Sequence, residues 1–199
     1  MRPVLTVIAL VAALCAAPVD ARPPSAEIVL ERLATWHRAL PRAQVEYALR
    51  IIERGKTRET QATLTDARAF ASPESSFADS RAVSLYTALL RGEGKDAMTS
   101  RGIDVAITAF YHLDRRVVVI LGAAPMQTGR SQVWFDRDTG APVRILLAPS
   151  AGATQDDSTD LSVGAHDHPG TEGRFPGTLR LHLGEVAIHA DFRRLVPVR

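Results

Sequence analysis

Two closely spaced histidines, His166 and His168, are the residues best suited to bind a metal ion. Residues two positions apart lie on one side of an extended chain, and imidazole nitrogens are common zinc ligands. Further ligands would come from the last part of the chain: His182, His189 and Asp191. However, Pro169-Gly170 follows directly and is typical of a polar loop, where histidines are ordinarily solvated. We therefore expect no metal, and a metal-dependent hydrolase stays as an alternative.

A phosphate-binding loop is the second chemical candidate, because Gly55-Lys56-Thr57 matches the end of that motif. The first glycine of the motif would stand at position 50, where the chain has Arg50. The segment also leads from one expected strand into another, without the helix N-terminus that holds a phosphate. We therefore predict a hairpin turn here, and no nucleotide.

Other signatures of catalysis are missing from the sequence. It contains neither a Gly-x-Ser-x-Gly elbow nor a His-Glu-x-x-His motif. Carboxylates are plentiful, but no spacing singles out an acid/base pair, and Asp156-Asp157 is typical of a solvated loop. We therefore expect a protein that is not an enzyme and needs no cofactor.

The first residues are typical of an export signal. Arg2 is followed by an apolar run of 14 residues, Val4–Ala17, and then by Pro18. Val19-Asp20-Ala21 places short side chains where a signal peptidase cleaves. The run is shorter than the roughly 20 residues that a membrane-spanning helix needs. We predict a cleaved signal peptide over residues 1–21.

The only cysteine, Cys15, lies inside this apolar run. Removal of the leader would leave a mature chain with no thiol, hence no disulfide and no thiol catalysis. A lipoprotein signal has a small residue before its cysteine, whereas Leu14 stands there. Lipidation of Cys15 remains an open alternative.

Composition and charge are those of an ordinary globular protein. Of 199 residues, 46% are hydrophobic, and 24 Lys and Arg against 22 Asp and Glu give a net charge of +2. The basic residues are scattered along the chain. A nucleic-acid-binding surface instead has clustered basic residues with interleaved aromatic ones. We therefore expect no nucleic-acid partner.

Apolar residues at helical spacing predict a first helix over residues 27–40, with Ser25 as its N-cap and Pro41 after its end. The apolar period then changes to two, which predicts a strand over residues 45–52. After Gly55 the antiparallel return strand is expected at residues 60–65.

A second helix is predicted from about residue 81, capped by Asp79 or Ser80 and ended by Gly92 and Gly94. A short turn of helix around residues 96–100 follows.

The rest of the chain predicts an antiparallel meander. Strands are expected at 105–111, 117–121, 131–136, 143–148, 178–183 and 186–192, and a polar loop at 150–160. Asp138-Thr139-Gly140 predicts a hairpin turn in which Gly140 adopts a positive φ. A long meander with two substantial helices is an α+β protein, and its thin helical cover leaves room for an apolar cavity against the sheet.

Several segments resemble the periplasmic carriers of outer-membrane lipoproteins, the LolA-like family. The hairpin Gln132–Arg144 resembles a family hairpin with an aromatic strand, an Asp, a turn through Thr and a Pro-x-Arg. The helix Glu27–Leu40 with the strand Val45–Ile52 resembles the family's opening. Gly173–Pro176, which leads into an alternating strand, resembles a Gly- and Pro-containing segment late in the family's sequences. Val83–Gly102 resembles the family's lid helices.

This resemblance implies a strongly curved antiparallel sheet, an unclosed β-barrel, covered by an N-terminal helix and short lid helices. It implies one half-barrel domain over residues 22–199 and a periplasmic monomer that binds acyl chains of lipoproteins or other lipids. Transport of lipoproteins to the outer membrane would follow. An envelope-stress sensor or regulator with a membrane protein partner is the alternative on the same fold.

On this basis we predict the residues that form the binding site. The sheet would line the cavity with Val45, Tyr47, Leu49, Ile51, Val105 and Ile107. The lid helices would contribute Leu85, Leu89, Leu90 and Met98. Methionine suits irregular acyl chains because its side chain repacks easily.

Overall fold

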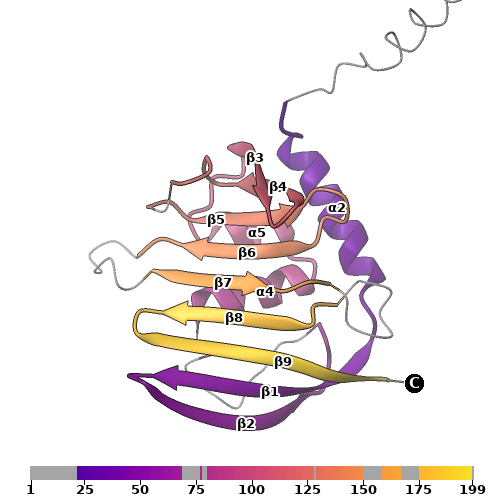
Figure 1. Cartoon of the computed structure of the whole chain (residues 1–199). Helices are drawn as coiled ribbons and strands as arrows, with labels where there is room; N and C mark the ends of the chain where they lie inside the picture. Colours follow the sequence, from indigo (N-terminus) through magenta and orange to yellow (C-terminus); the bar gives the residue numbers. More distant parts are fainter. Residues whose placement is uncertain are drawn as a thin grey trace, which may run out of the picture.

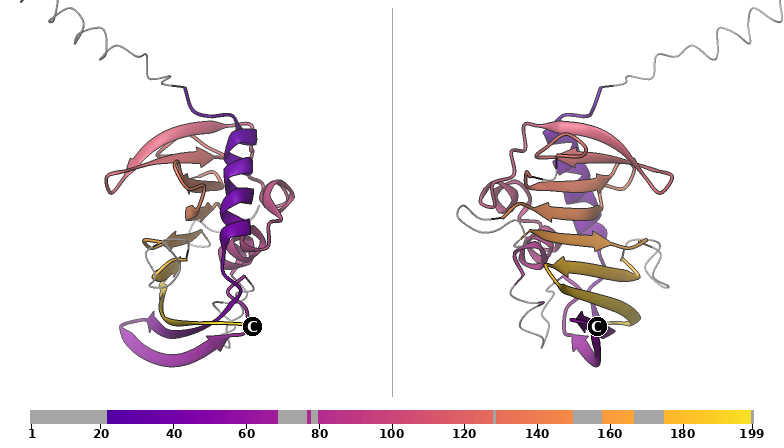
Figure 2. Two further views of the ribbon diagram at one scale, coloured as in Figure 1. Left: turned by 90° about the vertical axis from the view of Figure 1, so that its right-hand side faces the viewer. Right: turned by 60° about the vertical axis from the view of Figure 1, so that its left-hand side comes forward.

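The computed structural model describes residues 22–68, 77, 80–127, 129–149, 158–166 and 175–198. Nine antiparallel strands form one sheet in the order β2-β1-β9-β8-β7-β6-β5-β4-β3. The outermost strands, β2 and β3, do not pair with each other, so the sheet is open. Figure 1 shows the strands stacked in this order, and Figure 2 shows a strongly twisted, curved sheet with the helices on one side. The predicted α+β fold with an open, curved sheet is confirmed.

Three helices are present among the described residues: α2 (Ala26–Ala39), α4 (Arg81–Leu90) and α5 (Gly94–Thr99). Ser25 and Ser80 occupy the N-cap positions of α2 and α4, but neither side chain makes a capping hydrogen bond. The predicted cap positions are therefore right, while the expected hydroxyl contacts are absent. Gly94 begins α5 instead of ending α4. The alternative cap, Asp79, lies outside the described residues.

The strands are β1 (Ala43–Glu53), β2 (Lys56–Leu64), β3 (Thr108–Leu113), β4 (Arg116–Leu121), β5 (Gln132–Asp136), β6 (Pro142–Leu147), β7 (Thr159–Val163), β8 (Thr178–Leu183) and β9 (Val186–Pro197). The predicted hairpins β1–β2, β3–β4, β5–β6 and β8–β9 are all formed.

Two strand predictions were wrong. Val105 and Ile107 precede β3, because Asp104 forms a turn: its carboxylate accepts the backbone N–H of Ala106 at 3.1 Å, and its carbonyl accepts that of Ile107 at 3.0 Å. Thr159 and Asp160 begin β7 instead of ending a loop.

β7 is a strand because its apolar residues alternate toward the core. Leu161, which is fully buried, pairs with Ile145 of β6 and Leu181 of β8. The intervening polar residues Asp160 and Ser162 face the other side of the sheet. The loop expected at 150–160 included the first two residues of this strand.

The β5–β6 hairpin has the predicted turn, and the turn packs on α2. Oδ1 of Asp136 accepts hydrogen bonds from the backbone N–H groups of Asp138 (3.0 Å) and Thr139 (2.9 Å) and from the Thr139 hydroxyl (3.0 Å). Gly140 has φ +74°, and a Cβ at this position would lie 2.5 Å from the backbone carbon of Arg32. Arg32 in turn donates a hydrogen bond to the carbonyl of Arg137. This hairpin therefore fixes α2 over the sheet.

The main hydrophobic core lies between the inner face of the sheet and the helices. α4 is buried on nearly every side, and eight of its ten residues are inaccessible to solvent or nearly so. It packs against β6, β7, α5 and α2. A smaller cluster on the opposite face of the sheet contains Val118, Ile120, Trp134 and Val143.

Candidate functional site

A row of apolar side chains crosses the inner face of the sheet without interruption. From β1 to β4, successive paired residues are Ile51, Ile188, Leu181, Leu161, Ile145, Val133 and Leu121. Each is at most 5% exposed. The row crosses seven strands, and at about 4.8 Å between neighbours it is roughly 29 Å long. We call it the apolar row.

The β2 end of the apolar row is basic. Arg58 is the cross-strand partner of Ile51, and Lys56 is the partner of Glu53, one pair closer to the hairpin turn. Inner-face residues recur at every second position, and Ala62 and Leu64 mark this face on β2. Lys56 and Arg58 therefore occupy inner-face positions.

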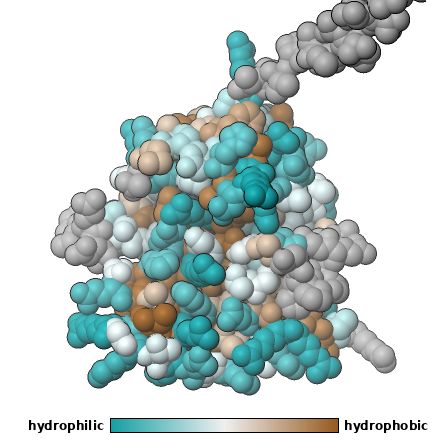
Figure 3. Space-filling model, in the orientation of Figure 1, coloured by the Kyte–Doolittle hydropathy of each residue, from teal (hydrophilic) through white to brown (hydrophobic). Residues whose placement is uncertain are grey.

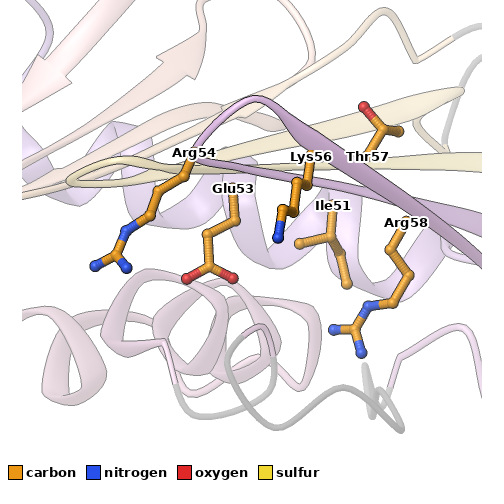
Figure 4. Close-up of a pocket in the computed structure, with 6 residues that line it drawn as sticks. All are labelled: Ile51, Glu53, Arg54, Lys56, Thr57 and Arg58. Carbon is orange, nitrogen blue, oxygen red and sulfur yellow. The ribbon is translucent and has the colours of Figure 1, made fainter.

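A pocket of about 590 Å³ opens at this end, lined by Ile51, Glu53, Arg54, Lys56, Thr57 and Arg58. We call it the hairpin pocket. In Figure 4 the side chains of Ile51, Lys56 and Arg58 extend to the same side of the hairpin, toward the helices, whereas Thr57 points away. Its volume lies within the ordinary range of small-molecule sites, about 300–1,000 Å³.

Most of the predicted binding residues lie together in the main core. Val45, Tyr47, Leu49 and Ile51 of β1 and Leu85, Leu89, Leu90 and Met98 of α4 and α5 are all buried members of it. Val105 is half-buried and packs against the core. Ile107 is half-buried before β3. Whether these residues contact a ligand remains a prediction.

Side chains occupy much of the space that the sequence predicts to be a cavity. Leu85, Leu89, Leu90 and Met98 are 0% exposed, so α4 and α5 pack closely over the inner face in this conformation. Ile51 lines the hairpin pocket, and Tyr47 lines a separate groove of about 250 Å³. The hairpin pocket thus reaches the apolar row at Ile51, the first residue of the row.

Among the described residues, four buried side-chain polar atoms make no hydrogen bond, and the hydroxyl of Tyr86 is one of them. The hydroxyl of Tyr86 on α4 is inaccessible to solvent and makes no hydrogen bond with any described residue. Burial raises the pKa of Tyr86, so the group is a neutral phenol at physiological pH. An unsatisfied buried polar group costs about 1–3 kcal/mol.

His37 links the end of α2 to the end of α4. Its ring atoms lie 3.1 Å from where a Cβ on Gly92 would stand. Burial lowers the pKa of His37, and the positive charges of Arg68 and Arg38 lower it further. The imidazole is therefore neutral at pH 7 and packs closely against the glycine.

The opposite face of the sheet carries a second pocket, of about 310 Å³, lined in part by Tyr111, Trp134, Arg144 and Asp160. Arg144 binds Asp160 through two hydrogen bonds of 3.0 and 2.6 Å and lies 5.1 Å from the ring of Trp134. The hydrogen bond to Asp160 raises the pKa of Arg144. The charge of Arg144 is thus already neutralised by Asp160.

The outer face of the sheet, opposite the helices, is covered largely by hydrophilic side chains, with smaller hydrophobic areas between them (Figure 3).

Three residues of the alternative metal site, His182, His189 and Asp191, lie near one another on the outer face of the β8–β9 hairpin, where their charges interact. His166 packs edge-on against Trp36 of α2, with the two ring centroids 5.8 Å apart. His182 and His189 lie on β8 and β9 at positions that alternate with the inner-face residues. No group of three metal-binding side chains occurs among the described residues. His168 lies outside them.

The prediction for the N-terminus also falls outside the described part: residues 1–21, with Cys15, are not in it. Among the residues that are described, no helix is long and apolar enough to cross a membrane.

The sequence analysis missed the basic residues of the hairpin pocket. Lys56 was assigned to a turn, and neither Lys56 nor Arg58 was predicted to be a binding residue. The sequence did contain an indication of this. Lys56 and Arg58 lie an even number of positions from Ala62 and Leu64, so all four residues share one face of the strand. Nothing in the sequence indicates that the hydroxyl of Tyr86 makes no hydrogen bond with a described residue.

No protein-family model and no curated protein matches the chain. A LolA superfamily protein from Nitrosomonas europaea has a similar structure, with a TM-score of 0.50 and 10% sequence identity over 88% of this chain and 94% of that one. A DUF1329 family protein from Desulfovibrio piger gives a TM-score of 0.47, at 10% identity over 86% of this chain and 92% of the other. A domain described as that of an outer membrane lipoprotein-sorting protein, from Vibrio parahaemolyticus, gives 0.45, also at 10% identity, over 86% and 92%.

The likeness to the Nitrosomonas protein extends over nearly the whole of both chains. It concerns the arrangement of the strands and helices, since only 10% of the aligned residues are identical. The resemblance found in the sequence is therefore confirmed at the level of the fold.

Proposed function

We propose that this chain, whose fold is LolA-like, is an exported, non-enzymatic protein that binds the acyl chains of lipoproteins or other lipids. The apolar row, open at the hairpin pocket, is the observation that carries the proposal. Carriage of lipoproteins through the periplasm toward the outer membrane is the corresponding role. The predicted leader 1–21 would deliver residues 22–199 to that compartment as a monomeric domain.

An acyl chain gains binding energy from an apolar surface without any catalytic group. Each methylene removed from water contributes about 0.8 kcal/mol. The apolar row offers roughly 29 Å of continuous hydrocarbon by the strand spacing. A chain that enters at Ile51 would lie across the strands and meet no polar side chain before β3.

Binding along the row at β6 and β7 requires α4 to move, because α4 packs against these two strands, and α5 packs in turn on α4. Replacement of the helix side chains by an acyl chain keeps the apolar wall of the sheet buried, so the wall is not exposed to water. Displacement of α4 would also let the hydroxyl of Tyr86 reach water or a ligand carbonyl. This recovers part of the roughly 1–3 kcal/mol that its burial costs. We therefore propose that α4 and α5 act as a lid.

Two measurements test acyl binding. Native mass spectrometry of the protein isolated from the periplasm should reveal bound acyl species. A fluorescent palmitate analogue should bind the purified protein and be displaced by palmitate. Protein that carries no acyl species and ignores the analogue would refute the proposal.

A matched pair of variants locates the site. Ile51 lines the hairpin pocket, whereas Ile52 faces the other side of the same strand. Ile51→Gln should weaken binding of the palmitate analogue by about tenfold or more, because it places an amide in the apolar path. Ile52→Gln should leave binding nearly unchanged. Circular dichroism checks that both variants fold, and equal effects would place the ligand elsewhere.

A further inference from the structure

The hairpin pocket combines an apolar wall with a basic rim. Ile51 supplies the wall and joins it to the apolar row. Arg54, Lys56 and Arg58 supply three positive charges against the single negative charge of Glu53. Arg54 also approaches Glu185 at 3.5 Å, but both side chains are 79% exposed, and such surface pairs contribute little. Lys56 and Arg58 are the rim cations that occupy inner-face positions, beside the start of the apolar row.

Within the described part of the chain, Lys56 lacks the kind of ion pair that Arg50 makes on the other face of the same hairpin. On the outer face, Arg50 is neutralised by Glu59 at 2.8 Å. On the inner face, Lys56 stands opposite Glu53, yet the two make no ion pair within the 4.0 Å range of such contacts. Arg58 stands opposite an apolar residue, Ile51. Its guanidinium has several donors, so it can bind a further anion in addition to the contact that it already makes.

We infer that the hairpin pocket binds an anionic lipid: an acyl chain lies on Ile51 and the apolar row, and its carboxylate or phosphate head group binds Lys56 and Arg58. The inference rests on the proposed function and adds the chemical class of the ligand. Charge complementarity identifies the head group, because charge-assisted hydrogen bonds to carboxylate or phosphate are about twice as strong as neutral ones. A neutral head group could accept hydrogen bonds from Lys56 but would form no ion pair with it.

The inner-face position of the cations sets the geometry. A head group at Arg58 is one strand spacing, about 4.8 Å, from the start of the apolar row at Ile51. An acyl chain attached to that head can therefore enter the row directly. Figure 4 shows the two basic side chains and Ile51 on the same side of the hairpin, as this arrangement requires.

Three probes with the same palmitoyl chain separate head-group recognition from chain binding: palmitate, palmitoyl lysophosphatidic acid and monopalmitoylglycerol. We expect the two anionic probes to bind the full chain about tenfold more tightly than the neutral one. The preference should decrease as salt is added, because exposed charges are screened. Inorganic phosphate alone should not displace any of the probes.

Two variants assign the effect to the rim. The double variant Lys56→Gln/Arg58→Gln should lose the preference for anionic probes and keep the affinity for monopalmitoylglycerol. The control Arg50→Gln changes a cation on the opposite face of the same hairpin and should retain the preference.

The outcomes are distinguishable. Equal binding of all three probes by the unmodified protein would refute the anionic head group and leave acyl binding intact. In that case the two cations would serve only to discourage pairing of the edge strand β2 with another chain. Displacement of the probes by inorganic phosphate at similar affinity would show a phosphate site without a chain. Failure of every probe to bind would refute the proposed function itself.

Discussion

At the scale of single residues, the buried hydroxyl of Tyr86 is the clearest departure from a fully satisfied core. The helix α4 places it among aliphatic side chains, and it makes no hydrogen bond with a described residue. The ring contributes to packing, while the hydroxyl lowers stability. Buried polar groups ordinarily have a partner. We therefore interpret this hydroxyl as a group that finds its partner in a second arrangement of α4.

The substitution Tyr86→Phe tests this interpretation. It removes the unsatisfied hydroxyl and keeps the ring, so the free energy of unfolding should rise by about 1 kcal/mol. Urea unfolding of the unmodified protein and the variant measures the difference. A less stable variant would show that the hydroxyl has a hydrogen-bond partner in solution, and the lid argument based on Tyr86 would then fail.

At the scale of elements, the β5–β6 hairpin and α2 hold each other in place. The turn after Asp136 approaches Arg32 so closely that only glycine fits at position 140. Gly55, in the turn of the β1–β2 hairpin, has nearly the same φ, +75° against +74°, but nothing lies within 4 Å of where its Cβ would be. The two glycines thus separate the effect of the backbone angle from the effect of crowding.

Alanine at these two positions should have unequal effects. Both substitutions place a side chain in the left-handed region, which costs roughly 1 kcal/mol. Gly140→Ala adds a collision with the backbone of α2, which costs a further 1–3 kcal/mol or so. Chemical denaturation of both variants measures the difference. Equal losses would mean that α2 moves away from the hairpin at little cost.

At the scale of the whole molecule, one curved sheet supplies both a long apolar wall and a basic opening at one edge. The helices cover the wall from a single side, as the two views in Figure 2 show. The wall belongs to strands from both ends of the chain, since β1 pairs with β9 along its length. The helical cover comes from α2, α4 and α5. A ligand that displaces the cover therefore need not disturb the sheet.

Acyl loading should stabilise the molecule as a whole while it loosens the lid. At a free ligand concentration of about 100 times Kd, the free energy of unfolding should rise by about 2.7 kcal/mol. Hydrogen exchange should become slower in the strands of the sheet and faster in α4 and α5. Thermal unfolding and exchange with and without palmitate measure both effects. Slower exchange in α4 on loading would contradict a lid that opens.

Much of the fold could be predicted because local patterns determine it. The alternation in β1 separates buried Val45 and Leu49 from exposed Arg50, and the turn at Gly140 requires the one residue type that it has. β7 was missed because it has only two apolar inner-face residues, Leu161 and Val163, while its first inner-face residue, Thr159, is polar. Val105 and Ile107 were assigned to a strand because the turn at Asp104 depends on hydrogen bonds that periodicity does not reveal.

The sequence by itself determined the class of the fold and the inward-facing residues of most strands, since both depend on neighbours a few positions apart. Only the tertiary structure decided which of those residues align across strands. Register brings Arg58, Ile51 and Ile188 from distant segments into one row. The same long-range packing decided that α4 covers the wall closely and that the opening lies at the β1–β2 hairpin. Local periodicity contains no information about how densely distant side chains fill the space between them.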